Sequence, residues 1–235
     1  MDQWLMNNNF LTCDDLQYKG LKLWQSKFGY RSSQDALFLL NFALEKISVR
    51  RHIKDVIELG IGSGIISMLL AAKIPYIKIT AIEIQDSLLE LSKKNISQLP
   101  DTIKQRILLR HIDIRNIPNK MIPQKYDLLI TNPPYYKIGT GRLSPSMEKR
   151  IAKYEIKCNL IDIISASQFL LKKHCIALII YPKERLSEFR QELRRFTFEK
   201  ATYHLYHNKN GRIDTIKSDE EYKDEFHLFI AELEK

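Results

Sequence analysis

The stretch that decides the fold is residues 53–72, IKDVIELGIGSGIISMLLAA. Residues 53–59, rich in Ile, Val and Leu, indicate a buried strand, and the apolar residues 65–72 indicate a helix. Between them lies a turn with glycine at every second position. Glycine lets a backbone approach a ligand closely, so a strand, a glycine turn and a helix in this order predict an α/β fold that binds a nucleotide-like ligand.

The spacing of the glycines distinguishes between two classes of nucleotide-like ligand. In the dinucleotide-binding fingerprint the third glycine follows the second by three residues, whereas here Gly60, Gly62 and Gly64 are evenly spaced by two. This departure disfavours a dinucleotide and favours S-adenosylmethionine, whose methionine part would lie over the turn that otherwise holds a pyrophosphate. The glycine pattern is a weak signal on its own, so the prediction depends on the residues that follow.

Two acidic residues downstream support the prediction that the glycine turn binds S-adenosylmethionine. Glu83 ends a third apolar strand, residues 80–83, nineteen residues after Gly64, where such folds place the acceptor for ribose hydroxyls. Asp113 follows an extended run, residues 108–112, and is suited to accept the amine of the cofactor adenine. Either acid could instead be a helix cap or a solvated loop residue, which is the commoner role.

A polar, rigid motif follows another buried strand, residues 126–130. There Asn132 could accept one proton of a planar exocyclic amine through its side-chain oxygen, the carbonyl of Pro133 could accept the other, and the ring of Tyr135 could stack on the base. The alternative is a strand that ends in an ordinary proline turn. The order of the glycine turn, the two acids and this motif favours an amine-modifying site.

These residues resemble the motifs of class I S-adenosylmethionine-dependent amino-methyltransferases: residues 58–64, Glu83, Asp113 and residues 132–135. Residues 29–40 and 135–160 are similar to the bacterial valine-tRNA (adenine-N6) methyltransferase family, which modifies the adenine just 3′ of the anticodon. The resemblance covers most of the chain from about residue 20. It implies a Rossmann-like class I methyltransferase fold, with a seven-stranded, mostly parallel sheet, helices on both faces and a C-terminal antiparallel hairpin.

The motifs and the resemblance together predict the site. The methyl donor is S-adenosyl-L-methionine, the product is S-adenosyl-L-homocysteine, and no metal is expected. The expected cofactor contacts are Glu58, Gly60, Gly62, Gly64, Glu83, Ile84, Asp113, Ile114 and Asn132. The expected catalytic residues are Asn132, Pro133 and Tyr135, and the expected substrate contacts are Tyr135, Tyr136, Arg142, Arg150 and Lys153. Family members commonly carry an Arg-His or Arg-Tyr pair in the loop after the catalytic motif, for which the nearest candidates are Arg150 and residues 153–155.

At 235 residues the chain is long enough for one full α/β domain. We predict an N-terminal extension that caps the cofactor site, residues 1–45, and a catalytic domain, residues 46–235. Further helices are expected over residues 35–46, 86–98, 156–171 and 187–196, strands over residues 21–28 and 175–181, and a hairpin turn at residues 209–212.

Charge indicates a polyanionic partner. Residues 136–217 hold 17 Lys and Arg against 8 Asp and Glu, and this excess begins directly after the proposed active site. A basic rim around a base pocket suits a phosphate backbone, most simply that of tRNA. The alternative is that the lysines keep the domain soluble. The rim is expected to comprise Arg142, Lys149, Arg150, Lys153, Lys157, Arg185, Arg190, Arg194 and Arg195.

Several other classes are disfavoured. Cys13, Cys158 and Cys175 are odd in number and widely spaced, which suits neither a disulfide framework nor a metal knuckle. His204 and His207 lack ligand partners at metal spacing and are expected to be structural. No apolar run reaches the ~18 residues of a membrane helix and the first residues do not resemble a secretory signal, so a cytoplasmic protein is expected.

Three alternatives stay open. A related motif serves methyltransferases that modify a glutamine amide (N5) of release factors, although these carry a helical N-terminal domain and only 52 residues precede Ile53. The protein could also methylate an amine in rRNA or DNA, although no segment large enough for a separate DNA-recognition domain is evident. A non-catalytic RNA-binding module would use the same basic surface, but would not require both motifs intact.

Overall fold

The computed structural model describes residues 10–139, 144–207, 213–217, 220 and 226–235. Its centre is an eight-stranded sheet with the order β5-β4-β3-β6-β7-β10-β8-β9. In chain order the strands are β3 (Asp55–Leu59), β4 (Lys78–Glu83), β5 (Ile107–His111), β6 (Tyr126–Thr131), β7 (Leu171–Pro182), β8 (Lys200–Tyr206), β9 (Ile213–Lys217) and β10 (Leu228–Glu234). The strands from β5 to β7 in this order are parallel, whereas β10 pairs antiparallel with both β7 and β8.

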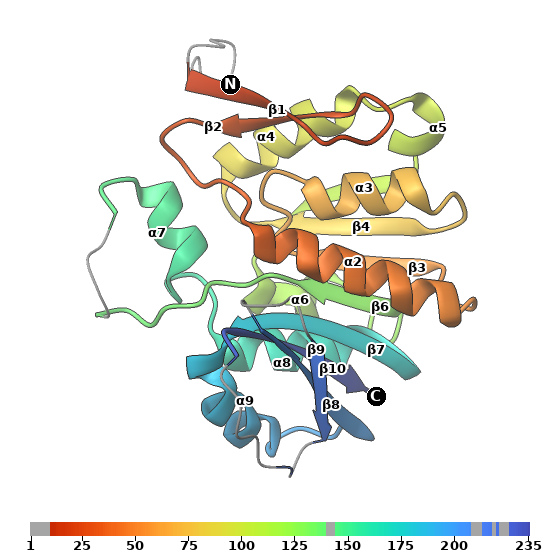
Figure 1. Cartoon of the computed structure of the whole chain (residues 1–235), viewed down its shortest axis with the longest axis vertical. Helices are drawn as coiled ribbons and strands as arrows, with labels where there is room; N and C mark the ends of the chain where they lie inside the picture. Colours follow the sequence, from red (N-terminus) through yellow and green to blue (C-terminus); the bar gives the residue numbers. More distant parts are fainter. Residues whose placement is uncertain (1–9, 140–143, 208–212, 218–219, 221–225) are drawn as a thin grey trace.

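Helices cover both faces of this sheet (Figure 1). On one face α2 (Gln34–Val49) and α3 (Ile65–Lys73) share an apolar core with the strands, and on the other α8 (Leu160–Leu170) and α9 (Leu186–Leu193) share a second core. Neighbouring residues of β3 divide between them, because Val56 belongs to the first core and Ile57 to the second. The apolar character of residues 53–59 on both sides therefore reflects a doubly covered parallel strand.

The remaining helices are short or lie at the periphery. They are α4 (Asp86–Ser97), α5 (Asp101–Lys104), α6 (Ile117–Lys120) and α7 (Met147–Lys153), with 3-10 turns at Ile114–Asn116 and Lys183–Arg185. In Figure 1 α7 projects away from the sheet, beside the ends of the central strands.

A separate two-stranded sheet, β1 (Leu11–Asp15) and β2 (Lys22–Ser26), lies beside α4 (Figure 1). Asn95 of α4 joins it to the glycine turn: its Oδ1 accepts a hydrogen bond from the Trp24 N–H at 2.8 Å, and its Nδ2 donates to the Ser63 carbonyl at 2.8 Å. The boundary that we predicted between residues 45 and 46 falls inside α2, a continuous helix that packs on the main sheet.

The Rossmann-like α/β fold and its C-terminal antiparallel hairpin are confirmed, but the prediction of seven strands is wrong. The described residues form eight strands in the main sheet, because β9 continues past β8 and pairs antiparallel with it. The expected hairpin turn, residues 209–212, lies outside the described residues. The strand that completes the core is β10, which inserts between β7 and β8.

The segment after the catalytic motif also differs from the prediction. The helix expected over residues 156–171 begins at Leu160, because Asn159 and Asp162 form a capping box there. The strand expected over residues 175–181 begins earlier, at Leu171, directly after that helix. The prediction started it too late because the residues before Cys175 are polar and do not show the apolar pattern of a buried strand. The short helix α7 was not predicted. No helix in the described part of the chain is long and apolar enough to cross a membrane.

Candidate active site

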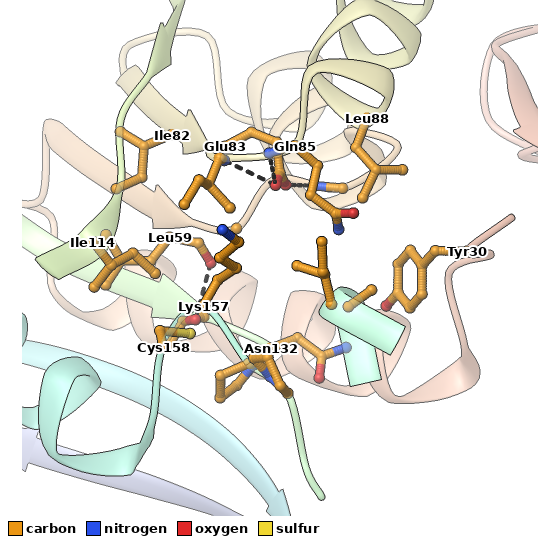
Figure 2. A pocket seen from close by; sticks show the side chains of 18 of the residues that line it. Tyr30, Leu59, Ile82, Glu83, Gln85, Leu88, Ile114, Asn132, Lys157 and Cys158 are labelled. Carbon is orange, nitrogen blue, oxygen red and sulfur yellow. Dashed lines mark hydrogen bonds between the residues drawn. The ribbon is translucent and has the colours of Figure 1, made fainter. Parts of the chain in front are cut away.

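A pocket lies where β3, β4 and β6 end (Figure 2). The carboxyl ends of parallel strands are where open α/β sheets bind ligands. Leu59 and Gly60 contribute one wall after β3, and Thr131 and Asn132 contribute another after β6. Figure 2 shows Glu83 and Asn132 on opposite sides of the pocket, so the acid and the amide that the sequence singled out face one cavity.

The glycine turn requires its glycines. Gly60, Gly62 and Gly64 have φ values of 73°, 58° and 92°, a region that residues with a Cβ rarely adopt. The Gly60 and Ile61 N–H groups donate to the Ile82 carbonyl at 3.0 Å, which fastens the turn to β4. Gly60 and Gly62 line the pocket, whereas Gly64 begins α3 behind it.

Glu83 is a buried carboxylate at the edge of the pocket, only 5% exposed. Its Oε2 accepts from the Gly62 N–H at 3.1 Å, and its Oε1 accepts from the N–H groups of Ile84 and Gln85 at 2.9 and 3.0 Å. Burial raises the pKa of Glu83, and these three donors oppose that rise. Oε1 already accepts two hydrogen bonds, whereas Oε2 accepts only one and has a lone pair left with which to accept a hydroxyl group of a ligand.

Glu58 lies behind the turn and does not line the pocket in the described residues. Its Oε2 accepts hydrogen bonds from the Ser67 N–H, at 3.1 Å, and from the Ser67 hydroxyl. Burial raises the pKa of Glu58 to about 8, against an ordinary value of 4.5. At neutral pH the Glu58 carboxyl of the cofactor-free protein is therefore mostly protonated, and a positive group bound next to it would lower its pKa and favour the carboxylate.

The motif after β6 is held from several sides. Thr131 donates to the Leu59 carbonyl at 2.9 Å, which ties β6 to β3. Asn132, Pro133 and Pro134 line the pocket. The Tyr135 hydroxyl lies 2.7 Å from Asn132 Oδ1 and 3.0 Å from Asp35 Oδ2. The amide predicted to act in catalysis is thus in direct contact with the tyrosine of the same motif.

The two tyrosines differ in exposure. Tyr135 is partly buried against both apolar cores, and burial raises the pKa of its phenol well above the ordinary value. Tyr136 is 49% exposed, and the centroid of its ring lies 5.5 Å from the ring centroid of buried Tyr154. The Tyr136 backbone is paired as well, because its N–H donates to the Lys153 carbonyl and its carbonyl accepts from the Glu155 N–H. Residues 153–155, candidates for the family's loop pair, therefore lie alongside the motif.

Asp113 is paired with a neighbouring arginine. Its carboxylate is bound by the Arg115 guanidinium, with the closest contact at 2.6 Å, and it caps the following turn by accepting from the Arg115 N–H. Arg115 lowers the pKa of Asp113. Asp113 does not line the described pocket, although Ile112, Ile114 and Ile84 do.

The predicted basic rim is split between residues on α7, beside the pocket, and a buried arginine beneath the motif. Arg150 and Lys153 lie on α7, whose residues Ile151 and Ala152 line the pocket, and Arg142 lies outside the described residues. The prediction that Arg185 belongs to a surface rim is wrong. Its side chain is 8% exposed because it pairs with Glu155 at 2.8 Å beneath the motif.

Three residues of the site were missed as individual contacts. Tyr30 lines the pocket, its N–H donates to Glu148 Oε1 at 2.6 Å, and burial raises the pKa of its phenol to about 12. Glu148 Oε2 also accepts from the Ser87 hydroxyl of α4 at 2.6 Å, so Glu148 joins α7 both to α4 and to the N-terminal segment that carries Tyr30. Asp35 reaches Tyr135 from α2. Tyr30 and Asp35 fall within the matched stretch 29–40 and Glu148 within the matched stretch 135–160, but none of the three was singled out as a site residue.

These residues fit S-adenosylmethionine. A backbone turn open at its glycines, a buried acid at the next strand end and the apolar side chains of Ile84 and Ile114 suit a charged amino acid, a ribose and an adenine respectively. The described part of the chain holds no cluster of His, Cys, Asp and Glu suited to a metal. The three cysteines are free.

The chain is similar in sequence to proteins named as tRNA methyltransferases. A protein named tRNA1(Val) (adenine(37)-N6)-methyltransferase from Porphyromonas gingivalis is 25% identical over 207 residues, covering 86% of this chain and 76% of that protein. One of the same name from Dyadobacter fermentans is 28% identical over 137 residues, covering 58% of this chain and 54% of that protein.

Solved structures share the fold. The hMettl16 catalytic domain in complex with MAT2A 3′UTR hairpin 6 has a TM-score of 0.58 and 15% identity, covering 98% of this chain and 78% of that one. P. horikoshii TYW2 in complex with MeSAdo has a TM-score of 0.53 and 12% identity, covering 96% and 71%. The model of the methyltransferase small domain matches residues 36–158. The chain therefore belongs to the methyltransferase small domain family, and is an S-adenosylmethionine-dependent methyltransferase with a class I fold.

Proposed function

We propose that this enzyme methylates the exocyclic N6 of an adenine in tRNA, and that the target is the adenine next to the anticodon of valine tRNA. The observation that carries the proposal is that Asn132 and Pro133 line the same pocket as Glu83 and the glycine turn. Acceptors for a planar amine thus adjoin the cofactor site. The names of the relatives support the choice of tRNA and of adenine.

We assign the cofactor to the two sides of this pocket. Glu83 would accept the ribose hydroxyls, and Glu58, behind the turn, would attract the positive amino group of the methionine part. The full set of proposed cofactor contacts is Glu58, Gly60, Gly62, Gly64, Glu83, Ile84, Asp113, Ile114 and Asn132. When bound, the cofactor supplies an electrophilic methyl group on a sulfonium.

The residues of the motif would activate the amine. Its lone pair is delocalised into the adenine ring, which makes it a poor nucleophile. The Asn132 oxygen and the Pro133 carbonyl would accept its two protons and so stabilise the positive charge that develops on nitrogen. Placement of the base beside the cofactor pocket supplies the rest of the acceleration. No general base is required, since the methylated ammonium loses its proton to water.

Stacking would hold the target base outside its helix or loop. Base–aromatic stacking contributes ~1–3 kcal/mol per base. Tyr136 has the more exposed ring, while Tyr135 is held by its hydroxyl and would form the floor of the site. Arg142, Arg150 and Lys153 are the proposed phosphate contacts, and residues 1–45 the proposed cap.

The test is to incubate the protein with methyl-labelled cofactor and separate tRNA, DNA and protein fractions, then digest the labelled RNA. We expect N6-methyladenosine from valine tRNA. Asn132→Ala serves as the control and should lower the transfer rate about a hundredfold or more, since losing one positioned acceptor costs ~2.7–4 kcal/mol. Methylated guanosine would refute the target base. Label confined to protein would refute the RNA substrate and indicate a glutamine-amide methyltransferase.

A further inference from the structure

The hydroxyl of Tyr135 lies between two oxygen atoms from distant parts of the chain. Asn132 Oδ1 is 2.7 Å from it, and Asp35 Oδ2, in the first turn of α2, is 3.0 Å from it. A phenol has one proton and can donate it to only one of these acceptors. Burial keeps the phenol protonated, because it raises the pKa of Tyr135 well above its ordinary value. One of the two oxygen contacts is therefore left without a proton.

The conflict disappears if the Asn132 carboxamide is turned end for end. The oxygen and the NH2 group of a carboxamide are almost equal in size, so the two orientations pack alike and differ only in hydrogen bonding. In the turned orientation the NH2 group donates to the phenol oxygen, and the phenol donates to the Asp35 carboxylate. The second bond is charge-assisted and about twice as strong as one between neutral groups. The Asn132 oxygen is then the end of the amide that Tyr135 does not bind.

We propose that Asp35 is a positioning residue for methyl transfer: through the Tyr135 hydroxyl it holds the Asn132 oxygen toward the acceptor amine. The inference rests on the proposed function, in which that oxygen accepts a proton of the target amine. The opposite orientation would set an NH2 donor against an N–H donor and leave the amine proton unpaired. Asp35 thereby links α2, at the start of the chain, to a catalytic group that follows β6.

Kinetics of four variants test this role. Asp35→Ala and Tyr135→Phe should each lower kcat about ten- to a hundredfold, and change the RNA KM and the S-adenosylhomocysteine Kd less than about twofold. Asp35→Asn should keep most of the activity, because its carboxamide oxygen also accepts the phenol proton. The double variant Asp35→Ala/Tyr135→Phe should be no slower than the slower single variant, since the groups act as one unit. Additive losses, or equal losses in Asp35→Asn and Asp35→Ala, would overturn the proposal.

A measurement without RNA separates this inference from the proposed substrate. The side-chain amide of Asn132 can be observed by ¹⁵N NMR and assigned from the signal lost in Asn132→Ala. We expect its shift to change and its hydrogen exchange to quicken in Asp35→Ala and Tyr135→Phe but not in Asp35→Asn, with melting temperatures showing that each variant is folded. An unchanged amide signal in Asp35→Ala would refute the relay. A responding amide in a protein that methylates no adenine would uphold the relay and refute the proposed substrate.

Discussion

The Nη1 atom of Arg185 donates a hydrogen bond to the Tyr135 carbonyl oxygen at 2.7 Å. The same guanidinium pairs with Glu155 at 2.8 Å, and the side chains of both are less than a tenth exposed. Glu155 in turn accepts from the Leu160 N–H at the start of α8. A buried ion pair thus connects the 3-10 turn after β7, the start of α8 and the backbone of the motif.

Arg185→Met should destabilise the protein by about 3–5 kcal/mol, because it leaves the Glu155 carboxylate buried without its partner. Urea unfolding measures this loss. The matched control is Arg185→Met/Glu155→Gln, which removes the charge as well and should recover part of the stability. Equal destabilisation of the two variants would show that the ion pair is not what the single substitution disrupts.

Glu83→Ala should weaken S-adenosylhomocysteine binding about ten- to a hundredfold, since hydrogen bonds to a charged acceptor contribute ~1.5–3 kcal/mol. Calorimetric titration measures the affinity. Asp113→Ala is the comparison and should weaken binding less, because the Asp113 carboxylate is already bound by Arg115. A larger effect at Asp113 than at Glu83 would reverse the assignment of the two acids.

Glu58→Gln should stabilise the cofactor-free protein at alkaline pH. Because folding raises the pKa of Glu58 from 4.5 to about 8, its favourable contribution is complete below the ordinary pKa and is lost as pH rises through about 8. The amide keeps an acceptor for Ser67 and does not ionise. The free energy of unfolding of the variant relative to the wild type should rise by roughly 2–4 kcal/mol between pH 5 and pH 9. If the difference in the free energy of unfolding between the variant and the wild type did not change with pH, Glu58 would not be the group that titrates in this range.

Arg150→Glu/Lys153→Glu should weaken tRNA binding, and should reduce the slope of log affinity against log salt by about one for each lost phosphate contact. Filter binding at several salt concentrations measures both quantities, and an unchanged cofactor affinity is the control. Lys200→Glu, on the N-terminal residue of β8, is a matched charge reversal that should have little effect. Binding of the wild type that is insensitive to salt would argue against an RNA substrate.

The sequence by itself determined the fold class and the cofactor. A strand, a glycine turn and a helix are contiguous in residues 53–72, and their geometry follows from local chemistry: the positive φ at Gly60, Gly62 and Gly64 is a property of glycine itself. Glu83 could be located as well, because it ends the next strand and parallel strands finish at one edge. The amide and prolines after β6 follow by the same reasoning.

Only the tertiary structure decided which distant groups meet that local framework. Asp35 reaches Tyr135 across 100 residues of chain and Glu148 reaches Tyr30 across 118, and no periodicity encodes such pairs. An arginine is usually expected at the surface, yet Arg185 is buried, because Glu155 pairs with its charge beneath the motif. The eighth strand likewise depends on pairing between β8 and β9. Side-chain pairing across the fold depends on how the elements pack, and a one-dimensional pattern does not specify it.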